Sequence, residues 1–440
     1  MTAFLSLFRP SHLRKFWDVL RRDGFSAAMA RARLYGRVIL FNEGRSDLNS
    51  GASAHRHRPF LAFWESIAQE GAFHVTQAPA VLTRRRRIAV IGDLNLPQCK
   101  KYRVEQLTEL WQENGVEVEY AHFLDFQRSA DLIEKATHLC LYRLSQSEQA
   151  SAYLYEARRL RMPVLYDIDD PLFSISAYAT YSNAKEIGEG LRWHFLSQAA
   201  SFASVMNACD IVSVSTPELQ AHAGLYTTRP VFLRRNFADT ESLSQGQAAA
   251  RTVTDKMSAS RPFTVAFSSG SNGREADFAT IAADIERFVC GGANRRLLVI
   301  GHFDTSRFSP ELLNRTETVP FGDYDEYLQT LAAADCMILP LTDDIFNRCK
   351  SGVRLIDATT VGLPCIATQV GDAGTMIEHG RTGFVVGDQC RWEDALSQLA
   401  NDRAGAIEMG RRARAHLEQH WSARLAEPII DRELVNWVMA

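Results

Sequence analysis

Short apolar segments rich in β-branched residues alternate along this chain with longer segments of helical pattern, and the series then begins a second time. Such runs, bounded by turn residues, are typical of buried parallel strands. We expect strands over 88–92, 116–120, 138–142, 163–167 and 210–215, and again over 263–267, 296–301, 318–321, 336–340, 364–368 and 383–386. Strands that alternate with helices predict two Rossmann-like, doubly wound parallel-sheet α/β domains that face a cleft.

The pattern divides the chain into four parts. We expect a basic helical extension with its linker over residues 1–80, and an N-terminal Rossmann-like domain over 81–240. The second domain is expected over 262–420, after a polar linker of small residues at 241–261. A C-terminal helix is expected over 421–440, and its crossing back to the first domain is left open. In such sheets ligands bind at the carboxyl ends of the strands, in this case in the cleft between the domains.

Composition excludes several classes of protein. The net charge of -3 argues against a nucleic-acid polycation. The eight cysteines form no C-x-x-C pair and no metal-ligand spacing, which favours reduced thiols over a disulfide framework. No apolar run reaches the length of a membrane span, and Arg9, Arg14 and Lys15 interrupt any signal-peptide core. We therefore expect a cytoplasmic location.

The first 45 residues are locally basic and contain one amphipathic pattern. Leu13, Phe16, Trp17 and Leu20 recur at helical spacing. A basic amphipathic helix can lie on an anionic membrane surface, which would make the protein peripheral on the inner face of the cell membrane. The alternative is a helix that packs on the main body and exposes its arginines to water. The sequence leaves both interpretations open.

The densest run of motifs lies at residues 346–388. It contains, in order, Lys350-Ser351, a helix with an acid at Asp357, a Gly362-Leu363-Pro364 turn into a strand, Val370-Gly371, and the turn 378–384. This stretch resembles the donor-binding half of glycosyltransferase family 4, the glycosyl transferases of group 1, which have the GT-B fold. The resemblance covers residues 88–435 in architecture and is specific in its motifs from about residue 262 onward. It implies an enzyme that moves a sugar from a nucleotide-diphosphate sugar to a glycan or lipid-linked acceptor.

The same stretch predicts part of the donor site. Lys350 and Ser351 stand where a helix is expected to begin, and unpaired N–H groups there favour phosphate. The resemblance implies that Asp357 holds the ribose, although Asp357 could instead be a solvated helix residue. The family places another acid eight positions earlier, where this chain has Cys349. Asp343 and Asp344 are candidates to replace it.

A second candidate cluster follows the strand expected at 263–267. Gly270, Ser271 and Asn272 form a small-residue loop before a helix, which is the pattern of a phosphate cradle. Arg274 is the cation of this loop, and its planar guanidinium suits a phosphate. The alternative is an ordinary Asn-Gly turn with a surface arginine.

Further donor-binding candidates lie at strand ends of both domains. The resemblance implies that Gly301, Phe321 and Gly322 hold the base, with the alternative that Phe321 belongs to the core. In the first domain, Gly92 would let the backbone approach the sugar phosphate, and Arg103 would reach into the cleft.

The strand expected at 163–167 is followed by two acids, Asp169 and Asp170, next to Asp167. Carboxylates at a strand end could orient an acceptor hydroxyl or contact the donor sugar. Two other interpretations remain open. The acids could bind a hard cation, or they could cap the next helix and make a turn.

The predicted catalytic residues are Asp169, Asp170, Arg274 and Lys350. The cations would stabilise the departing diphosphate. The resemblance implies retention of anomeric configuration and a role in surface polysaccharide biosynthesis. Expected partners are the nucleotide sugar, the acceptor and an anionic membrane, with no nucleic acid, no bound metal and no cofactor beyond the substrate. Three rivals remain: a nucleotide-sugar epimerase, a non-catalytic relative, and a membrane-surface adaptor working through residues 1–45.

Overall fold

The structure, a computed structural model, describes residues 84–440 except 186, 187, 254, 259, 271–273 and 389, together with scattered positions between 16 and 33 and residue 65. The basic helix predicted within residues 1–45 and its linker therefore lie largely outside the described residues. Residues Met1–His74 and Val75–Ala440 form separate compact units. Both sheets belong to the second unit.

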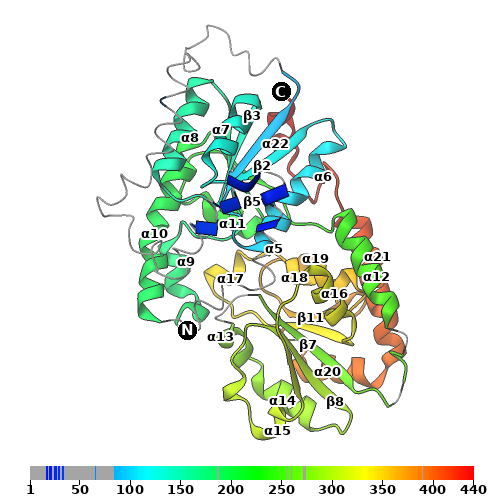
Figure 1. The fold of residues 1–440 in the computed structure, drawn as a ribbon. Helices are drawn as coiled ribbons and strands as arrows, with labels where there is room; N and C mark the ends of the chain where they lie inside the picture. Colours follow the sequence, from blue (N-terminus) through cyan, green and yellow to red (C-terminus); the bar gives the residue numbers. More distant parts are fainter. Residues whose placement is uncertain are drawn as a thin grey trace. The chain divides into compact units, whose positions relative to one another are not determined.

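The first sheet, in the part of the chain that the structure describes, has six parallel strands in the order β2-β1-β3-β4-β5-β6 (Figure 1). Their bounds are β1 (Arg87–Gly92), β2 (Glu117–His122), β3 (His138–Tyr142), β4 (Val164–Ile168), β5 (Ile211–Val214) and β6 (Val231–Leu233). We call this region, residues 84–239, the N lobe. The strand order reverses between β1 and β3, so a ligand crevice is expected at their carboxyl ends.

The second sheet also has six parallel strands among the described residues, in the order β12-β11-β10-β7-β8-β9. They are β7 (Phe263–Ser269), β8 (Arg295–Gly301), β9 (Thr316–Val319), β10 (Cys336–Leu339), β11 (Cys365–Thr368) and β12 (Gly383–Val386). Counted from β7, this is the order 3-2-1-4-5-6 of dinucleotide-binding folds, with its switch point between β7 and β10. We call residues 263–420 the C lobe. The predicted fold class is confirmed; β6 is an additional strand.

Helices connect the strands of both lobes. Those of the N lobe are α5 (Pro97–Lys100), a π-helical turn η3 (Lys101–Glu105), α6 (Gln106–Gln112), α7 (Phe126–Lys135), α8 (Glu148–Arg159), α9 (Ile175–Thr180), η4 (Ser182–Lys185), α10 (Glu189–Ala208) and α11 (Pro217–Ala223). Those of the C lobe are α13 (Glu275–Ala279), α14 (Ala282–Cys290), η5 (Thr305–Arg307), α15 (Pro310–Leu313), α16 (Tyr324–Ala332), α17 (Ile345–Arg348), α18 (Val353–Thr360), α19 (Ala373–Met376), α20 (Trp392–Asn401) and α21 (Arg403–His420). Several begin at a Ser, Thr or Asp whose side chain accepts a hydrogen bond from a backbone N–H of the first turn, as Ser147 does for α8 and Asp344 for α17.

Two segments between or beyond the lobes differ from expectation. The stretch predicted as a linker at 241–261 contains α12 (Thr240–Thr252), which the Asp239 side chain caps and which packs against α16 and α18. Its QAAAR segment has high helix propensity, and packing against the C lobe completes the helix. The helix expected over 421–440 is confined to α22 (Arg432–Met439).

The chain end returns to the N lobe. α22 contacts β6, and the Asp431 carboxylate just before it accepts a hydrogen bond of 2.6 Å from the backbone N–H of Leu233. One apolar cluster runs continuously through both lobes, from Ile88 and Trp111 to Leu355 and Leu434. None of the described helices is long and apolar enough to span a bilayer.

Candidate active site

The N lobe comes close to the switch point of the C lobe, which lies between β7 and β10. At Gly270, just after β7, an added Cβ would lie 2.6 Å from Oε1 of Gln98, a residue of α5. The tip of the Gln98 side chain from the N lobe therefore lies against the backbone of Gly270. Ser271 and Asn272, the other predicted members of this loop, lie outside the described residues.

Three cationic side chains converge beside this loop: Arg274, Lys350 and Arg354. Arg354 donates through Nη1 to the Ser268 carbonyl at 3.0 Å, which ties it to the end of β7. Burial, and after it the charge of Arg274, lowers the pKa of Lys350. The same two causes lower the pKa of Arg354 to about 10. We call these three residues the cation cluster.

A buried carboxylate, that of Asp277, lies within the cation cluster. It is 1% exposed, and Arg274 Nη1 lies 3.4 Å from its Oδ2. Burial alone would raise the pKa of Asp277, but the charges of Lys350 and Arg274 outweigh burial and hold it below its usual value. Asp277 also accepts hydrogen bonds from Asn183 Nδ2 at 2.7 Å and Asn347 Nδ2 at 2.9 Å. It therefore ties an N-lobe loop to the C lobe and only partly balances the cluster.

The guanidinium of Arg274 has unused hydrogen-bonding capacity. Its Nε is buried and has no hydrogen-bond partner within the described part of the chain. A buried donor without a partner costs free energy, and an anionic ligand would satisfy it. The structure thus excludes the alternative of an ordinary surface arginine at this position.

The predicted base-binding residues Gly301 and Phe321 lie in contact. Gly301 has φ of 98°, a left-handed conformation, and a side chain there would overlap the Phe321 ring and the Ser269 carbonyl. The Phe321 ring is half-buried and lies 5.3 Å from the Tyr327 ring. Gly322 is exposed and packs its backbone against Glu326, which completes the capping box of α16.

Asp357 is buried where the lobes meet. Its exposed fraction is 6%, which excludes the alternative of a solvated helix residue. Oδ1 accepts hydrogen bonds from Tyr102 of the N lobe and, at 2.8 Å, from Tyr324. Burial raises the pKa of Asp357 to about 6, although both tyrosines act against this increase. Ser351, near the start of α18, accepts a hydrogen bond of 2.7 Å from Asn236 Nδ2 of the N lobe.

Cys349, which stands where the resemblance implies an acid, is 2% exposed. Burial, followed by the charge of Asp170, raises the pKa of its thiol to about 12. Asp343 forms a surface ion pair with Arg348, and Asp344 caps α17. Both proposed substitutes are therefore engaged locally. Among the carboxylates whose charge acts on Cys349, namely Asp170, Glu218 and Asp344, that of Asp170 acts most strongly.

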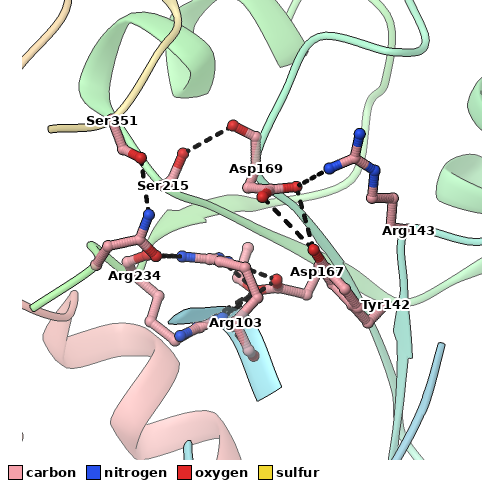
Figure 2. Close-up of polar contacts among 10 residues, drawn as sticks. Arg103, Tyr142, Arg143, Asp167, Asp169, Ser215, Arg234 and Ser351 are labelled. Atoms are coloured by element: carbon pink, nitrogen blue, oxygen red, sulfur yellow. Dashed lines mark hydrogen bonds and ion pairs between the residues drawn. The ribbon is translucent and has the colours of Figure 1, made fainter. Parts of the chain in front are cut away.

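The prediction that Arg103 reaches into the cleft is wrong for this structure. Arg103 is 0% exposed and donates to both oxygens of Asp167, at 2.9 Å and 2.6 Å (Figure 2). Arg234 lies 3.2 Å from the same carboxylate. Burial would raise the pKa of Asp167, but the two arginines hold it below its usual value. The long side chain of Arg103 is drawn inward because it must neutralise a buried charge.

Gly92 also differs from expectation. A Cβ there would lie 2.7 Å from the carbonyl oxygen of Tyr142 and 2.8 Å from its Cβ. The close approach that glycine permits at this position is to β3 of the same sheet, because the two strand ends are packed together. Gly92 still ends β1, one of the two strands that flank the N-lobe switch point.

Asp169 and Asp170 face Arg143 at the carboxyl ends of β3 and β4. Arg143 Nη1 lies 3.2 Å from Asp169 Oδ1 and 3.5 Å from Asp170 Oδ2. In Figure 2 the Asp169 carboxylate points toward Arg143 and the Tyr142 hydroxyl, away from the Arg103–Asp167 pair. Arg143 has φ of 52°, and such strain in a residue other than glycine is often found at functional sites. Among the described residues there is no group of three or more His, Cys, Asp or Glu side chains that could hold a metal ion.

The part of the C lobe that contains these residues is similar to a known protein family. Residues 275–402 match the family model for the glycosyl transferases of group 1. This matched segment lies within the C lobe, and we call it the group 1 domain. The expected resemblance is confirmed over these residues, which contain α13, Lys350, Arg354 and Asp357.

Individual relatives match this chain over limited segments. The chain is 37% identical over 95 residues to N-acetyl-alpha-D-glucosaminyl L-malate synthase of Bacillus anthracis, covering 21% of this chain and 24% of that protein. It is 30% identical over 162 residues to D-inositol 3-phosphate glycosyltransferase of Nocardia farcinica, covering 34% of this chain and 35% of that protein. The matches thus span about a quarter to a third of the length of these curated relatives.

Similarity to a solved structure extends over both lobes. Sucrose-phosphate synthase from Thermosynechococcus elongatus superposes with a TM-score of 0.53 and 16% identity, over 77% of this chain and 95% of that one. At this identity the likeness concerns the fold alone. The fold of two lobes, each built on a parallel sheet, is the GT-B glycosyltransferase fold, and the second lobe contains the group 1 domain.

The site also contains polar residues that the sequence did not single out. They are Arg354 and Asp277 of the group 1 domain and Tyr181 of the N lobe. Arg354 lies four positions after Lys350, in the first turn of α18, and this spacing was an available signal. Asp277 lies three positions after Arg274 in α13. Tyr181 has no local signal, because its partner Lys350 is 169 residues away.

Proposed function

We propose that this chain is a glycosyltransferase that moves a sugar from a nucleoside diphosphate sugar to an acceptor held between its lobes. The observation that carries the proposal is the cation cluster of Arg274, Lys350 and Arg354 beside the switch point of a group 1 domain. A diphosphate needs several cations, and ligands of doubly wound sheets bind at this edge.

In the proposed reaction the bond between the anomeric carbon and the diphosphate oxygen breaks, and a bond from that carbon to the acceptor hydroxyl oxygen forms. The proton of the acceptor hydroxyl passes to the departing diphosphate. Negative charge develops on the departing diphosphate. The cation cluster would stabilise that charge, with the unpaired Nε of Arg274 available as a donor. Close contact between the lobes, as at Gly270 and Gln98, would exclude water from the reacting sugar.

The remaining site residues take their proposed roles from this arrangement. Asp357 would hold the ribose, exchanging its tyrosine partners for ribose hydroxyls. Gly301 and Phe321 would pack against the base. Asp169 and Asp170 would orient the acceptor hydroxyl or a hydroxyl of the donor sugar. Asp170 is the better placed for the donor, because its charge reaches both Arg274 and Cys349.

The proposal includes finer expectations from the resemblance: retention of anomeric configuration, a glycan or lipid-linked acceptor, and a role in surface polysaccharide biosynthesis. The names of the relatives describe an N-acetylglucosaminyl group joined to malate and a glycosyl group transferred to inositol 3-phosphate. These two names supply the first donor and acceptors to test. The anomeric proton coupling of the product, measured by NMR, checks retention.

The test is release of nucleoside diphosphate from a panel of nucleotide sugars, with and without acceptors, by wild type and by Arg354→Ala. We expect turnover with at least one donor and a loss of about 10²- to 10³-fold in Arg354→Ala. Lys135→Ala, which removes an exposed lysine of α7, is the matched control and should retain full activity. Equal turnover by Arg354→Ala and wild type would refute the assignment of the site. Release without any acceptor would point to hydrolysis or epimerisation.

We propose further that residues 1–45 attach the enzyme to anionic membranes. What supports this is their excess of arginine together with the amphipathic spacing of Phe16, Trp17 and Leu20. Flotation with vesicles containing anionic lipid should recover the full chain at low salt and lose it at high salt. If the chain stays unbound at low salt, this part of the proposal is wrong.

A further inference from the structure

Tyr181 of the N lobe reaches into the cation cluster of the C lobe. It follows α9, and its ring stacks on Phe346 of α17 with centroids 4.2 Å apart and planes inclined by 15°. Lys350 Nζ lies 4.5 Å from the centroid of the Tyr181 ring and 3.0 Å from its hydroxyl oxygen. The ammonium of Lys350 is therefore held against the opposite lobe through both the ring and the hydroxyl.

The contacts of Lys350 fix the direction of its ammonium. An ammonium has three hydrogens to donate. One goes to the Tyr181 hydroxyl and one to Oδ1 of Asn347. No hydrogen bond within the described residues takes the third, so it is available to a ligand. Without the Tyr181 hydroxyl, the flexible lysine chain would lose one of its two oxygen acceptors and with it much of its orientation.

We propose that Tyr181 is a positioning residue for Lys350, so that the N lobe completes the phosphate site of the C lobe. The proposal rests on the proposed function and adds to it a determinant that lies outside the group 1 domain. Binding of the diphosphate would then depend on the contact between the lobes, and a separated C lobe would hold Lys350 loosely.

The charges around Lys350 give this contact a measurable consequence. The cations Arg274 and Arg354 and the acids Asp277 and Asp344 lie nearby, on or beside α13, α17 and α18. Burial and the charge of Arg274 lower the pKa of Lys350, whereas Tyr181 and Asp277 act to raise it. Removing the hydroxyl should therefore lower the pKa of Lys350 further, and the lysine would lose its charge at a lower pH.

Tyr181→Phe tests the proposal, because phenylalanine keeps the ring stacked on Phe346 and removes only the hydroxyl. Tyr178→Phe is the matched control. Its ring also packs against Phe346, with centroids 5.3 Å apart, while in the described part of the chain its hydroxyl makes no hydrogen bond with Lys350. The readout is the dissociation constant of a nucleoside diphosphate, measured from pH 7 to pH 10 by calorimetry, alongside that of the same nucleoside without phosphates.

We expect Tyr181→Phe to weaken nucleoside diphosphate binding about tenfold at pH 7. Affinity should also begin to fall at a lower pH than in wild type. Nucleoside binding should be unchanged in both variants, and Tyr178→Phe should match wild type throughout.

Three outcomes overturn the proposal. If Tyr181→Phe binds the diphosphate as wild type does while Lys350→Ala does not, Tyr181 has no positioning role and the proposed function stands. If nucleoside and diphosphate affinity fall together, the effect of Tyr181 is on folding of the site. If wild type binds no nucleoside diphosphate at all, the proposed function fails and this inference fails with it.

Discussion

The two lobes have related architecture but differ in how the carboxyl ends of their strands are charged. The N lobe balances its charges internally, with three arginines and three aspartates in contact: Arg103, Arg143 and Arg234 with Asp167, Asp169 and Asp170. The C lobe gathers three cations, Arg274, Lys350 and Arg354, near two buried carboxylates, those of Asp277 and Asp344. The N-lobe pairs use their charge to hold the protein together. The C-lobe cluster has positive charge left for a ligand.

This difference separates structural from functional arginines. The sequence predicted both Arg103 and Arg274 as residues of the donor site, and in the structure both side chains are largely buried. Arg103 is paired bidentately with Asp167. Arg274 has one long ion pair of 3.4 Å and a buried Nε without a partner in the described residues. What distinguishes the site is the imbalance of charge and hydrogen bonding, more than the residue type.

The largest expected effect concerns the paired charges of the N lobe. Asp167→Asn would leave Arg103 and Arg234 buried without their counter-ion, and we expect it to lower the free energy of unfolding by about 3–5 kcal/mol. Urea denaturation followed by circular dichroism measures the loss. Asp343→Asn, which breaks an exposed pair with Arg348, should cost less than about 1 kcal/mol. Equal losses in the two variants would mean that Asp167 is not a structural counter-ion.

A smaller effect on the free energy of unfolding is expected from the titration of Asp357, which lies where the lobes meet. Burial raises its pKa from the usual 3.8 to about 6. The stabilisation that comes from holding this proton is complete below about pH 4 and is lost as the pH rises through 6. A pKa difference of about two corresponds to at most about 3 kcal/mol.

In the Asp357→Asn variant, the side chain at position 357 has no group that titrates in this pH range. The stability of the variant relative to wild type should therefore improve as the pH rises from 4 to 6, measured by urea denaturation at each pH. Asp372, whose pKa burial also raises to about 6, is present in both proteins, so its contribution cancels. Parallel stability curves for variant and wild type would contradict a buried, protonatable Asp357.

The smallest expected effect concerns the cation cluster of the C lobe. Lys350→Ala should weaken binding of a nucleoside diphosphate by about 1.5–3 kcal/mol, because it removes a charged donor from the site. Arg143→Ala, which removes a cation of the N lobe, should leave that affinity within about 0.5 kcal/mol while it impairs transfer. Titration calorimetry gives both values. A larger loss in Arg143→Ala than in Lys350→Ala would assign the phosphates to the N lobe.

The sequence predicted the sheets well because buried parallel strands have a local signature. The expected strand at 138–142 coincides with β3, and that at 383–386 with β12. β6 was missed because it has only three residues, Val231–Leu233. The linker expected at 241–261 formed α12 because packing against α16 and α18 stabilises its alanine-rich segment.

The site was predictable only where its determinants are local. Lys350, Ser351 and Asp357 follow one another in and before α18, so their grouping is evident from spacing. The partners of buried charges are not local: Arg103 meets Asp167 across 64 residues, and Tyr102 meets Asp357 across 255. No periodicity encodes such pairs, and Arg103 was therefore assigned to the ligand when it belongs to the core of the N lobe.

The most direct test of the central claim is equilibrium binding of a nucleoside diphosphate to wild type and to the folded triple variant Arg274→Ala, Lys350→Ala, Arg354→Ala. We expect wild type to bind, gaining about 2.7 kcal/mol of stability when the ligand is at a hundred times its dissociation constant, and the triple variant to gain nothing. Binding of equal strength by the triple variant would show that the cation cluster is not the phosphate site.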